Sequence, residues 1–292
     1  GRGACAVNAL DKRLHAFRKD LADERLKGQV EAGRFVAGRP ARIGVPVADM
    51  RAAPDASAGL NTQLLLGDDL RVFEEGPEWV WAQAARDLYV GYVACSALAA
   101  GGGEPPHVVC APRTFVYSGA DLRLPSKACL SMGSRVRVDR FAETRGTKYA
   151  LLATGEALVA APVRPVGEYA ADYVGVAEEL LSTPYLWGGS SAFGIDCSGL
   201  VQLSMRMAGR AAPRDSDMQA AGLGETFDPG KDLAGLRRGD LVFWKGHIAI
   251  MLDAQNIIHA NGHTMMVSRE QLSDAVERIA YLYGGPTGFR RP

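Results

Sequence analysis

Hydrophobic residues recur every three to five positions between residues 8 and 33, among many charged ones. These apolar positions are Leu10, Leu14, Phe17, Leu21 and Leu26. Because residues three and four apart share one face of a helix, the spacing predicts at least one amphipathic helix in an N-terminal helical segment over residues 1–38. We expect this helix to pack against the segments that follow it.

After Arg39 the pattern changes to short alternating runs such as RVFEE and WVWAQ, separated by turn residues in GDD and EEGPE. Alternation with frequent turns is typical of a small antiparallel barrel, which we place at residues 39–100. The Gly- and Pro-rich stretch AAGGGEPPH (99–107) predicts a linker. Similar runs follow, including TFVYS and KYALLA, and predict a second barrel over residues 104–166 without a visible residue-level repeat.

The third segment follows the Pro-containing join APVRPVG and covers residues 168–288. Its apolar spacing predicts helices at 169–181 and 197–207, the second ending at Gly209. Shorter apolar runs then predict several strands between 240 and 283, namely DLVFW, HIAIML, NIIHA, TMMVS and RIAYLY. Helices first and strands afterwards indicate an α+β domain.

Composition and charge exclude several classes of function. Lys and Arg total 33, and Asp and Glu also total 33, so the formal net charge is zero. Such a balance argues against a broad nucleic-acid interface or a polybasic membrane surface. No apolar stretch approaches the roughly 20 residues that span a bilayer, and the start GRGACAVNAL lacks the pattern of a signal peptide. We therefore expect no nucleic-acid and no membrane partner, and the oligomeric state stays open.

The cysteines are Cys5, Cys95, Cys110, Cys129 and Cys197. An odd number at irregular spacing, with no C-x-x-C pair, gives neither a disulfide framework nor a zinc site. We expect a reducing, cytoplasmic location and no bound metal. Because the sequence begins at Gly, a removed N-terminal signal would instead place the protein in the periplasm or outside the cell.

Cys197 stands in the string YLWGGSSAFGIDCSGL (185–200), between an acid and a serine, after a glycine-rich turn and before an apolar run. This arrangement predicts a thiol at the start of a helix. The unpaired N–H groups and partial positive charge of a helix start favour thiolate over thiol and lower the pKa of a cysteine. Since a buried structural cysteine needs none of these features, Cys197 is a candidate nucleophile.

A cysteine nucleophile needs a base, and the base needs a polar group that orients it. His247 opens the run HIAIML, and His259 closes IIHA twelve residues later, with the short turn DAQN between the runs. The two strands should pair as a hairpin, which brings both imidazoles within hydrogen-bonding range. A single strand histidine is more often a core or surface residue, but two of them with a helix-start cysteine favour catalysis.

Three separated strings carry a resemblance by their order and spacing, namely YLWGGSSAFGIDCSGLVQ, RRGDLVFWKGHIAIM and IIHANG. The segment from residue 168 on resembles the NlpC-type cell-wall peptidases, which are papain-like cysteine peptidases. The resemblance implies Cys197 as nucleophile, His247 as general base and acid, and His259 as the residue that orients His247. It also implies that Tyr185 helps to hold the tetrahedral oxyanion, with loop packing as its alternative role, and that no metal or cofactor takes part.

The two upstream barrels resemble bacterial SH3-like domains, the first over DMRAAPDASAGLNTQLLLGDDLRVFEEGPEWVWAQAARDLYVGYV. An NlpC-type domain behind such barrels is similar to γ-D-glutamyl-L-diamino acid endopeptidases, which require a free N-terminal L-Ala. The resemblance implies that the first barrel and the acid before the nucleophile, Asp196, bind the alanine ammonium. A helix cap is an equally good role for Asp196, and the two roles are compatible.

Other cleft residues follow from the same resemblance. Tyr89 and Asp68 are the candidates from the first barrel, with core packing and a turn as their alternative roles. The remaining substrate-binding candidates are Ser198, Arg214, Ser216 and Trp187. Arg214 would pair with a substrate carboxylate, or else is a solvated surface charge. Trp187 and Trp244 would form walls of the cleft or pack in the core.

We therefore expect a cysteine endopeptidase that acts on murein peptides of the form L-Ala-γ-D-Glu-diamino acid in cell-wall recycling. The bond cleaved would be the γ-D-glutamyl–diamino acid bond, through a cysteinyl thioester. An exported hydrolase of intact peptidoglycan would use the same chemistry, and a non-catalytic wall-binding protein is the alternative from another class. The sequence leaves open whether the diamino acid is diaminopimelate or lysine.

Overall fold

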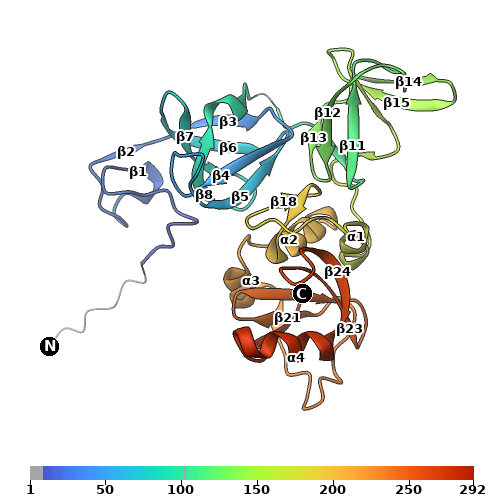
Figure 1. The fold of residues 1–292 in the computed structure, drawn as a ribbon. Coiled ribbons are helices and arrows are strands. Elements are labelled where there is room, and N and C mark those ends of the chain that lie inside the picture. The colour runs from blue at the N-terminus through green and yellow to red at the C-terminus, as the bar shows by residue number, and fades with distance from the viewer. Residues whose placement is uncertain (1–8, 102) are drawn as a thin grey trace.

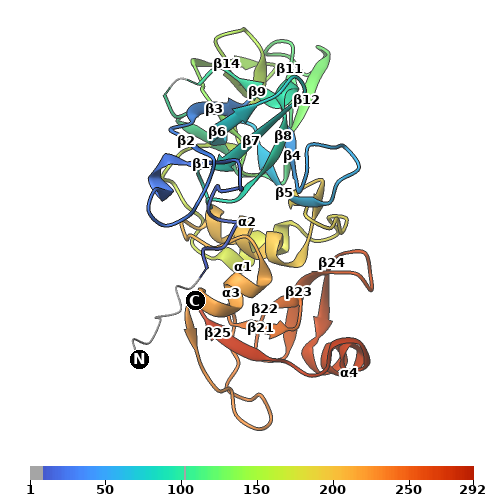
Figure 2. The ribbon, with the colours of Figure 1, turned by 90° about the vertical axis from the view of Figure 1, so that its left-hand side faces the viewer.

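The computed structural model describes residues 9–101 and 103–292, which form an N-terminal segment, two small β-domains and a larger C-terminal domain (Figure 1). We call the β-domains the first barrel (residues 39–99) and the second barrel (residues 107–165). Both lie at the same end of the C-terminal domain, near α2 (Cys197–Met207) and β18 (Ser190–Ser191), as Figures 1 and 2 show from two sides. The barrels therefore face the segment that leads into Cys197.

The N-terminal segment has no α-helix among residues 9–38, so the predicted amphipathic helix is wrong there, and its remaining part lies outside the described residues. The regular elements are β1 (Leu21–Asp23), a 3-10 helix (Glu24–Leu26) and β2 (Arg34–Val36). Leu21 instead packs with Phe73 and Trp81 of the first barrel, and Arg18 binds Glu74. Short isolated helices have little stability in water. The contacts with the barrel bury these apolar side chains although the segment does not form a helix.

The first barrel is a single seven-stranded sheet in the order β5-β4-β8-β7-β6-β3-β9. Its elements are β3 (Arg39–Ile43), β4 (Val47–Arg51), β5 (Leu60–Leu65), β6 (Asp69–Glu75), β7 (Trp79–Ala84), β8 (Val90–Ala94), a 3-10 helix (Cys95–Ala97) and β9 (Leu98–Ala99). Alternate residues of these strands point inward, so that Ile43, Met50, Leu64 and Val93 share one buried cluster. The predicted short-strand architecture is confirmed here.

The second barrel consists of a three-stranded sheet, β13-β10-β17, and a five-stranded sheet, β12-β11-β16-β15-β14. Its strands are β10 (His107–Val109), β11 (Arg113–Tyr117), β12 (Ser126–Ser131), β13 (Arg135–Val136), β14 (Arg140–Thr144), β15 (Thr147–Leu151), β16 (Ala157–Val159) and β17 (Val163–Pro165). Met132 is buried in the same cluster as Leu200 and Leu203 of α2. The second barrel is therefore part of the support of α2, and its SH3-like character stays a prediction.

The C-terminal domain has a six-stranded sheet in the order β20-β25-β21-β22-β23-β24. Its elements are α1 (Tyr173–Glu179), β18, β19 (Gly194–Ile195), α2, α3 (Ser216–Gly222), β20 (Glu225–Thr226), β21 (Leu241–Trp244), β22 (His247–Met251), β23 (Asn256–Asn261), β24 (Met266–Gln271), α4 (Leu272–Tyr283) and β25 (Gly288–Arg291). Strand residues alternate between two faces: Ile248 packs with Leu200 of α2, and Ala249 packs with Ile279 of α4. The sheet thus lies between α2 and α4, and the predicted α+β class is confirmed.

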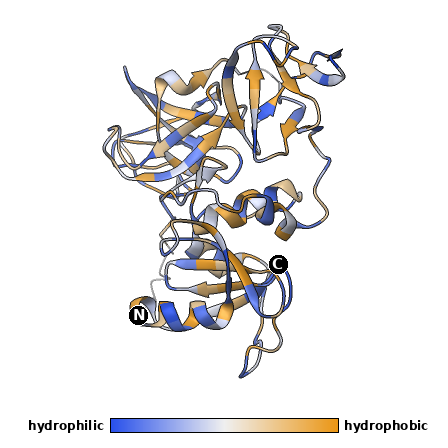
Figure 3. Cartoon of the chain, turned by 45° about the vertical axis from the view of Figure 1, so that its right-hand side comes forward, coloured by the Kyte–Doolittle hydropathy of each residue, from blue (hydrophilic) through white to orange (hydrophobic). Residues whose placement is uncertain are grey.

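One predicted strand is wrong, because RIAYLY (278–283) lies in the helix α4. Leu272, Ala275 and Ile279 are buried three and four residues apart, as on one face of a helix, and pack beneath the sheet. Figure 3 shows hydrophobic and hydrophilic residues alternating around this helix at the bottom of the molecule. The predicted helix at 169–181 is shorter, since Asp172 caps α1 only at Tyr173. No helix among the described residues is long and apolar enough to cross a membrane.

Candidate active site

Cys197 is the first residue of α2, as predicted, and its side chain is buried. Asp196 caps the helix, because its carboxylate accepts the amide N–H of Gly199 at 2.8 Å. Gly199 packs so closely on the preceding loop that a Cβ there would lie 2.5 Å from the carbonyl oxygen of Gly189. The glycine-rich turn and the cap together fix the position of the thiol.

The two strand histidines meet as the sequence predicted. β22 and β23 form an antiparallel pair, and Nε2 of His247 lies 2.8 Å from Nδ1 of His259. With Nε2 engaged in this way, Nδ1 is the ring nitrogen of His247 left for the substrate and the nucleophile. His247 is therefore held by His259 in the way that a general base requires.

The thiol of Cys197 lies beside the start of the strand that carries His247. The amide N–H of Ile248, the residue after His247, and the amide N–H of Ser198 both face the sulfur and favour its anionic form. Tyr185 is close enough to the thiol for their charges to interact. The sulfur therefore lies against the backbone at the start of β22, one residue from His247, and within electrostatic range of the Tyr185 phenol.

The protonation states differ from the prediction of a low thiol pKa. Burial, helped by the carboxylate of Asp196, raises the pKa of Cys197 to about 12, which outweighs the helix start. Burial, together with the electrostatic influence of His259 and Arg278, lowers the pKa of His247 to about 3. At neutral pH the free site is therefore a neutral thiol beside a neutral imidazole, and the proton has to move when a substrate is attacked.

Sequence reasoning missed the residue behind the second histidine. Nε2 of His259 lies 2.9 Å from the carboxylate of Glu270 on β24, and Arg278 of α4 binds the same carboxylate at 2.7 Å. β23 pairs with β24 so that His259 lies opposite Ser268, which puts Glu270 on the same face of the sheet as His259. An acid in the strand after the second histidine was the available signal.

Arg214 does not reach a substrate carboxylate, so that prediction is wrong, and so is its alternative as a solvated charge. Its side chain is 1% exposed, and its guanidinium donates to Asp196, Ser198 and Thr62 at 2.9 Å each. Arg214 is therefore saturated by the protein and holds Asp196 and Ser198 in place. Ser198 is buried in this network, whereas Asp196 keeps 14% of its side chain exposed.

The first barrel contacts the loop before Cys197 directly. Gln63 accepts the amide N–H of Ser190 at 3.0 Å, and the hydroxyl of Thr62 lies 3.1 Å from that of Ser190. Gly188, with φ of +79°, lies so close to the barrel that a Cβ would be 2.5 Å from the carbonyl oxygen of Leu60. The barrel and the catalytic loop therefore share an interface without space for a larger residue at Gly188.

The structure places the two candidates from the first barrel in different surroundings. Tyr89 is buried and donates its hydroxyl to Asp215, at the start of α3, at 2.9 Å. Its contact with the substrate stays a prediction. Asp68 binds Arg86 and Arg206, and Arg206 is nine residues after Cys197, about 13 Å further along α2. The carboxylate of Asp68 is thus already paired with two arginines, far from the thiol. The prediction that Asp68 binds the ammonium is therefore wrong.

A cleft of about 390 Å³ opens beside the two histidines. Its lining residues are Tyr185, Trp187, Gly246, His247, His259, Asn261, Gly262, His263, Arg278, Ile279, Tyr281, Leu282 and Tyr283. Trp187 is 74% exposed at the rim, which fits the predicted cleft wall. Trp244 is buried in the core, with its ring 5.6 Å from that of His247, so it supports the base instead of forming a wall. Ser216 begins α3, and its substrate contact stays a prediction.

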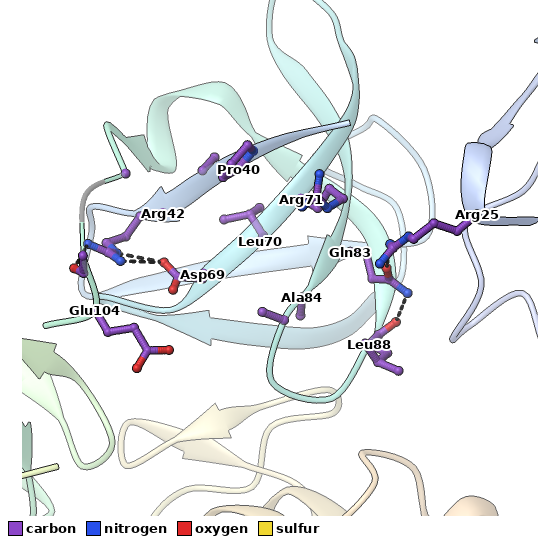
Figure 4. Close-up of a pocket in the computed structure, with 14 residues that line it drawn as sticks. Arg25, Pro40, Arg42, Asp69, Leu70, Arg71, Gln83, Ala84, Leu88 and Glu104 are labelled. Atoms are coloured by element: carbon purple, nitrogen blue, oxygen red, sulfur yellow. Dashed lines mark hydrogen bonds and ion pairs between the residues drawn. The ribbon is translucent and has the colours of Figure 1, made fainter. Parts of the chain in front are cut away.

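A larger cavity of about 760 Å³ lies on the first barrel (Figure 4). Its lining residues include Arg42 and Asp69, which pair with each other, and Gln83, which donates to the carbonyl oxygen of Leu88. The described residues that line it include no cysteine and no histidine. The two histidines and Tyr185 therefore line the smaller cleft of the C-terminal domain and not this cavity.

Two segments of the chain match known domain families. Residues 182–283 match the NlpC/P60 family, and residues 50–98 match the bacterial dipeptidyl-peptidase SH3 domain. The chain is similar to dipeptidyl-peptidase 6 of Lysinibacillus sphaericus, with 39% identity over 28% of each chain. It is also similar to the gamma-D-glutamyl-L-lysine dipeptidyl-peptidase of Bacillus subtilis, with 34% identity over 35% of each chain. The alignments therefore span about a third or less of these curated relatives.

Among solved structures, an NlpC/P60 family protein from Bacillus cereus shares the fold over most of the molecule. The TM-score is 0.70 at 23% identity, and the match covers 87% of this chain and 99% of the other. An NlpC/P60 endopeptidase from Photobacterium damselae gives a TM-score of 0.57 over 85% of this chain and 70% of its own. Residues 182–283 are therefore an NlpC/P60 domain, and residues 50–98, which precede it, are a bacterial dipeptidyl-peptidase SH3 domain.

Proposed function

We propose that the protein is a cysteine endopeptidase that hydrolyses the γ-D-glutamyl–diamino acid bond of murein peptides with a free N-terminal L-Ala. The observation that carries this proposal is the position of Cys197 at the start of α2, where its sulfur faces the amide N–H next to His247 and the first barrel contacts the loop before it. The His247 imidazole is in turn held by His259. A nucleophile and base supply acyl transfer, and a barrel over the catalytic loop limits the length of substrate on the N-terminal side. The names of the relatives point to the same bond.

In the proposed reaction, Nδ1 of His247 removes the proton of the Cys197 thiol as the sulfur attacks the γ-carbonyl carbon. The tetrahedral oxyanion is held by Tyr185 and by backbone N–H groups at the start of α2. His247 then protonates the leaving amine of the diamino acid, and the acyl group stays on sulfur as a thioester. Water, deprotonated by His247, hydrolyses the thioester and restores the thiol.

We assign recognition of the free alanine amine to Asp196. Arg214 holds this carboxylate from its buried side, while the exposed edge of Asp196 lies next to the nucleophile. An ammonium gains an ion pair there, whereas an acylated amine leaves the carboxylate edge unpaired and desolvated. Free peptides released during wall turnover carry such an amine, so we assign the protein to the recycling of murein peptides in the cytoplasm.

Cleavage of L-Ala-γ-D-Glu-diaminopimelate and of its N-acetylated form, followed side by side by mass spectrometry, tests the proposal. We expect the free diamino acid to be released from the unblocked peptide, by the wild type and not by Cys197→Ala. Equal rates on both peptides would favour an exported hydrolase of intact peptidoglycan. Equal release by the wild type and Cys197→Ala would refute the nucleophile, and no release from either peptide would favour a wall-binding protein.

A further inference from the structure

A line of polar side chains continues behind the base on the face of the sheet that α4 covers. Nε2 of His247 and Nδ1 of His259 are 2.8 Å apart, and Nε2 of His259 is 2.9 Å from Oε2 of Glu270. Beyond them, Nη2 of Arg278 lies 2.7 Å from Oε2 and 2.9 Å from Oε1 of Glu270. Three strands and one helix thus contribute one residue each to a single hydrogen-bonded chain.

Glu270 fixes which nitrogen donates in each of these hydrogen bonds, because an ionised carboxylate only accepts hydrogen bonds. Nε2 of His259 must therefore carry the proton that points to Glu270. In a neutral His259, Nδ1 is then the acceptor, so the proton between the two imidazoles belongs to Nε2 of His247. Nδ1 of His247 is left unprotonated, which is the form that a general base needs.

The opposite order of protons would disable the base. If Nδ1 of His259 carried the proton, Nε2 of His247 would accept it and Nδ1 of a neutral His247 would be protonated. Such an imidazole has no free electron pair for a thiol proton. The reaction therefore depends on a hydrogen-bond acceptor behind His259, at its Nε2. The two histidines alone do not supply this acceptor, and Glu270 does.

Arg278 keeps Glu270 in the acceptor form. Burial would raise the pKa of Glu270, but the hydrogen bonds from His259 and Arg278 lower it to about 2. Arg278 of α4 and His259 of β23 both donate hydrogen bonds to the Glu270 carboxylate, so it is held from two sides. Above a pH of about 2 the carboxylate is therefore ionised throughout the range in which a peptidase works.

We propose that Glu270, held by Arg278, is a positioning residue that sets the tautomers of His259 and His247 and so makes Nδ1 of His247 the base. This inference rests on the proposed function for its kinetic readout, and it has a second readout that does not need a substrate. Glu270 acts through the imidazoles and does not touch the reacting atoms. Removing its charge therefore changes kcat while the contacts that bind the substrate remain.

The kinetic test compares Glu270→Gln, Glu270→Asp and the control Glu277→Gln with the wild type on L-Ala-γ-D-Glu-diaminopimelate. Glu277 is exposed on α4 and makes no hydrogen bond or ion pair with a described residue. An amide can donate as well as accept, so Nε2 of His259 loses its obligate acceptor. We expect Glu270→Gln to lose about 10–100-fold in kcat, the size of loss that follows removal of the carboxylate partner of a metal-bound histidine. KM should change little, Glu270→Asp should keep more activity than Glu270→Gln, and Glu277→Gln should match the wild type. Unchanged kcat in Glu270→Gln, or Glu270→Asp below Glu270→Gln, would overturn the inference.

The second test is ¹⁵N NMR of the imidazole nitrogens in the substrate-free protein, which has five histidines. We expect His247 to be protonated at Nε2 alone in the wild type and in Glu277→Gln, and to become a mixture of tautomers in Glu270→Gln. A wild type with Nδ1–H on His247, or with a cationic His259, would overturn the inference. If the tautomers behave as expected while no variant cleaves the peptide, the proposed function fails and the role of Glu270 stands.

Discussion

Replacing Arg214 by Met tests whether this arginine is a buried anchor of the catalytic loop. The substitution keeps an unbranched apolar stem and removes every donor of the guanidinium. It leaves Asp196, Thr62 and the carbonyl oxygen of Gly189 without the partner that now binds each of them. Removing one partner of a buried ion pair costs about 3–5 kcal/mol, because the other charge stays behind uncompensated. That loss is a large part of the roughly 5–15 kcal/mol by which domains are stable.

Urea unfolding, followed by fluorescence and circular dichroism, measures this loss as the shift in transition midpoint multiplied by the slope. The matched control is Arg238→Met, because Arg238 also forms ion pairs, with Asp172 and Glu178, but its side chain is 42% exposed. Exposed ion pairs contribute about 0–1 kcal/mol. We therefore expect Arg214→Met to be less stable than Arg238→Met by about 2 kcal/mol or more. Equal stabilities would refute the assignment of Arg214 as a buried anchor.

A double-mutant cycle separates the Asp196–Arg214 pair from the other partners of Arg214. Asp196→Asn keeps a side chain that caps helices well and removes the negative charge. If the two charges compensate each other, the double variant should lose less stability than the sum of the single losses, by about 0.5–3 kcal/mol. Strictly additive losses would mean that Arg214 acts through Thr62 and Ser198 and not through Asp196.

Three further predictions concern reactivity, substrate and the barrel interface. Because burial raises the pKa of Cys197 to about 12, alkylation of the free protein by iodoacetamide should speed up about tenfold for each pH unit between pH 7 and pH 10; a rate that levels off near pH 8 would contradict this. The cleft beside His247 is lined, among the described residues, by no Asp or Glu that would repel a carboxylate, so kcat/KM should be higher for the diaminopimelate peptide, with its extra carboxylate, than for the lysine peptide; equal values would contradict the reasoning. Gly188→Ala places a Cβ against the barrel backbone at a φ of +79°, and should raise KM for the free peptide and lower the melting temperature, whereas an unchanged KM would show that the interface does not shape the cleft.

The reactive core of the site could be predicted because its geometry is local. Cys197 follows its own cap by one residue, and a hairpin brings His247 and His259 together over twelve residues. Periodicity and turn chemistry act over such distances. The helix start, the hairpin and the contact between the imidazoles were therefore all visible in the printed sequence.

Contacts between distant segments explain what the sequence did not reveal. The spacing around Leu21 is helical, yet this residue is buried by Phe73 and Trp81 of the barrel, about fifty to sixty residues later. The short apolar run RIAYLY predicts a strand, but its buried member Ile279 continues a helical spacing from Leu272. The pKa of Cys197 likewise depends on burial by strands that the string around it does not contain. In each case tertiary packing overrides a local signal.

Arg214 shows why the proposed amine site and the nucleophile should be read as one unit. Its guanidinium binds Thr62 of the first barrel, the cap residue Asp196 and the next hydroxyl, Ser198, on the two sides of Cys197. A shift of the barrel would therefore move the cap of α2, and with it the thiol, because a buried network leaves little free space for adjustment. A substrate whose amine pairs with Asp196 binds to a member of the same hydrogen-bond network. The first barrel, through this arginine, accordingly helps to position the nucleophile.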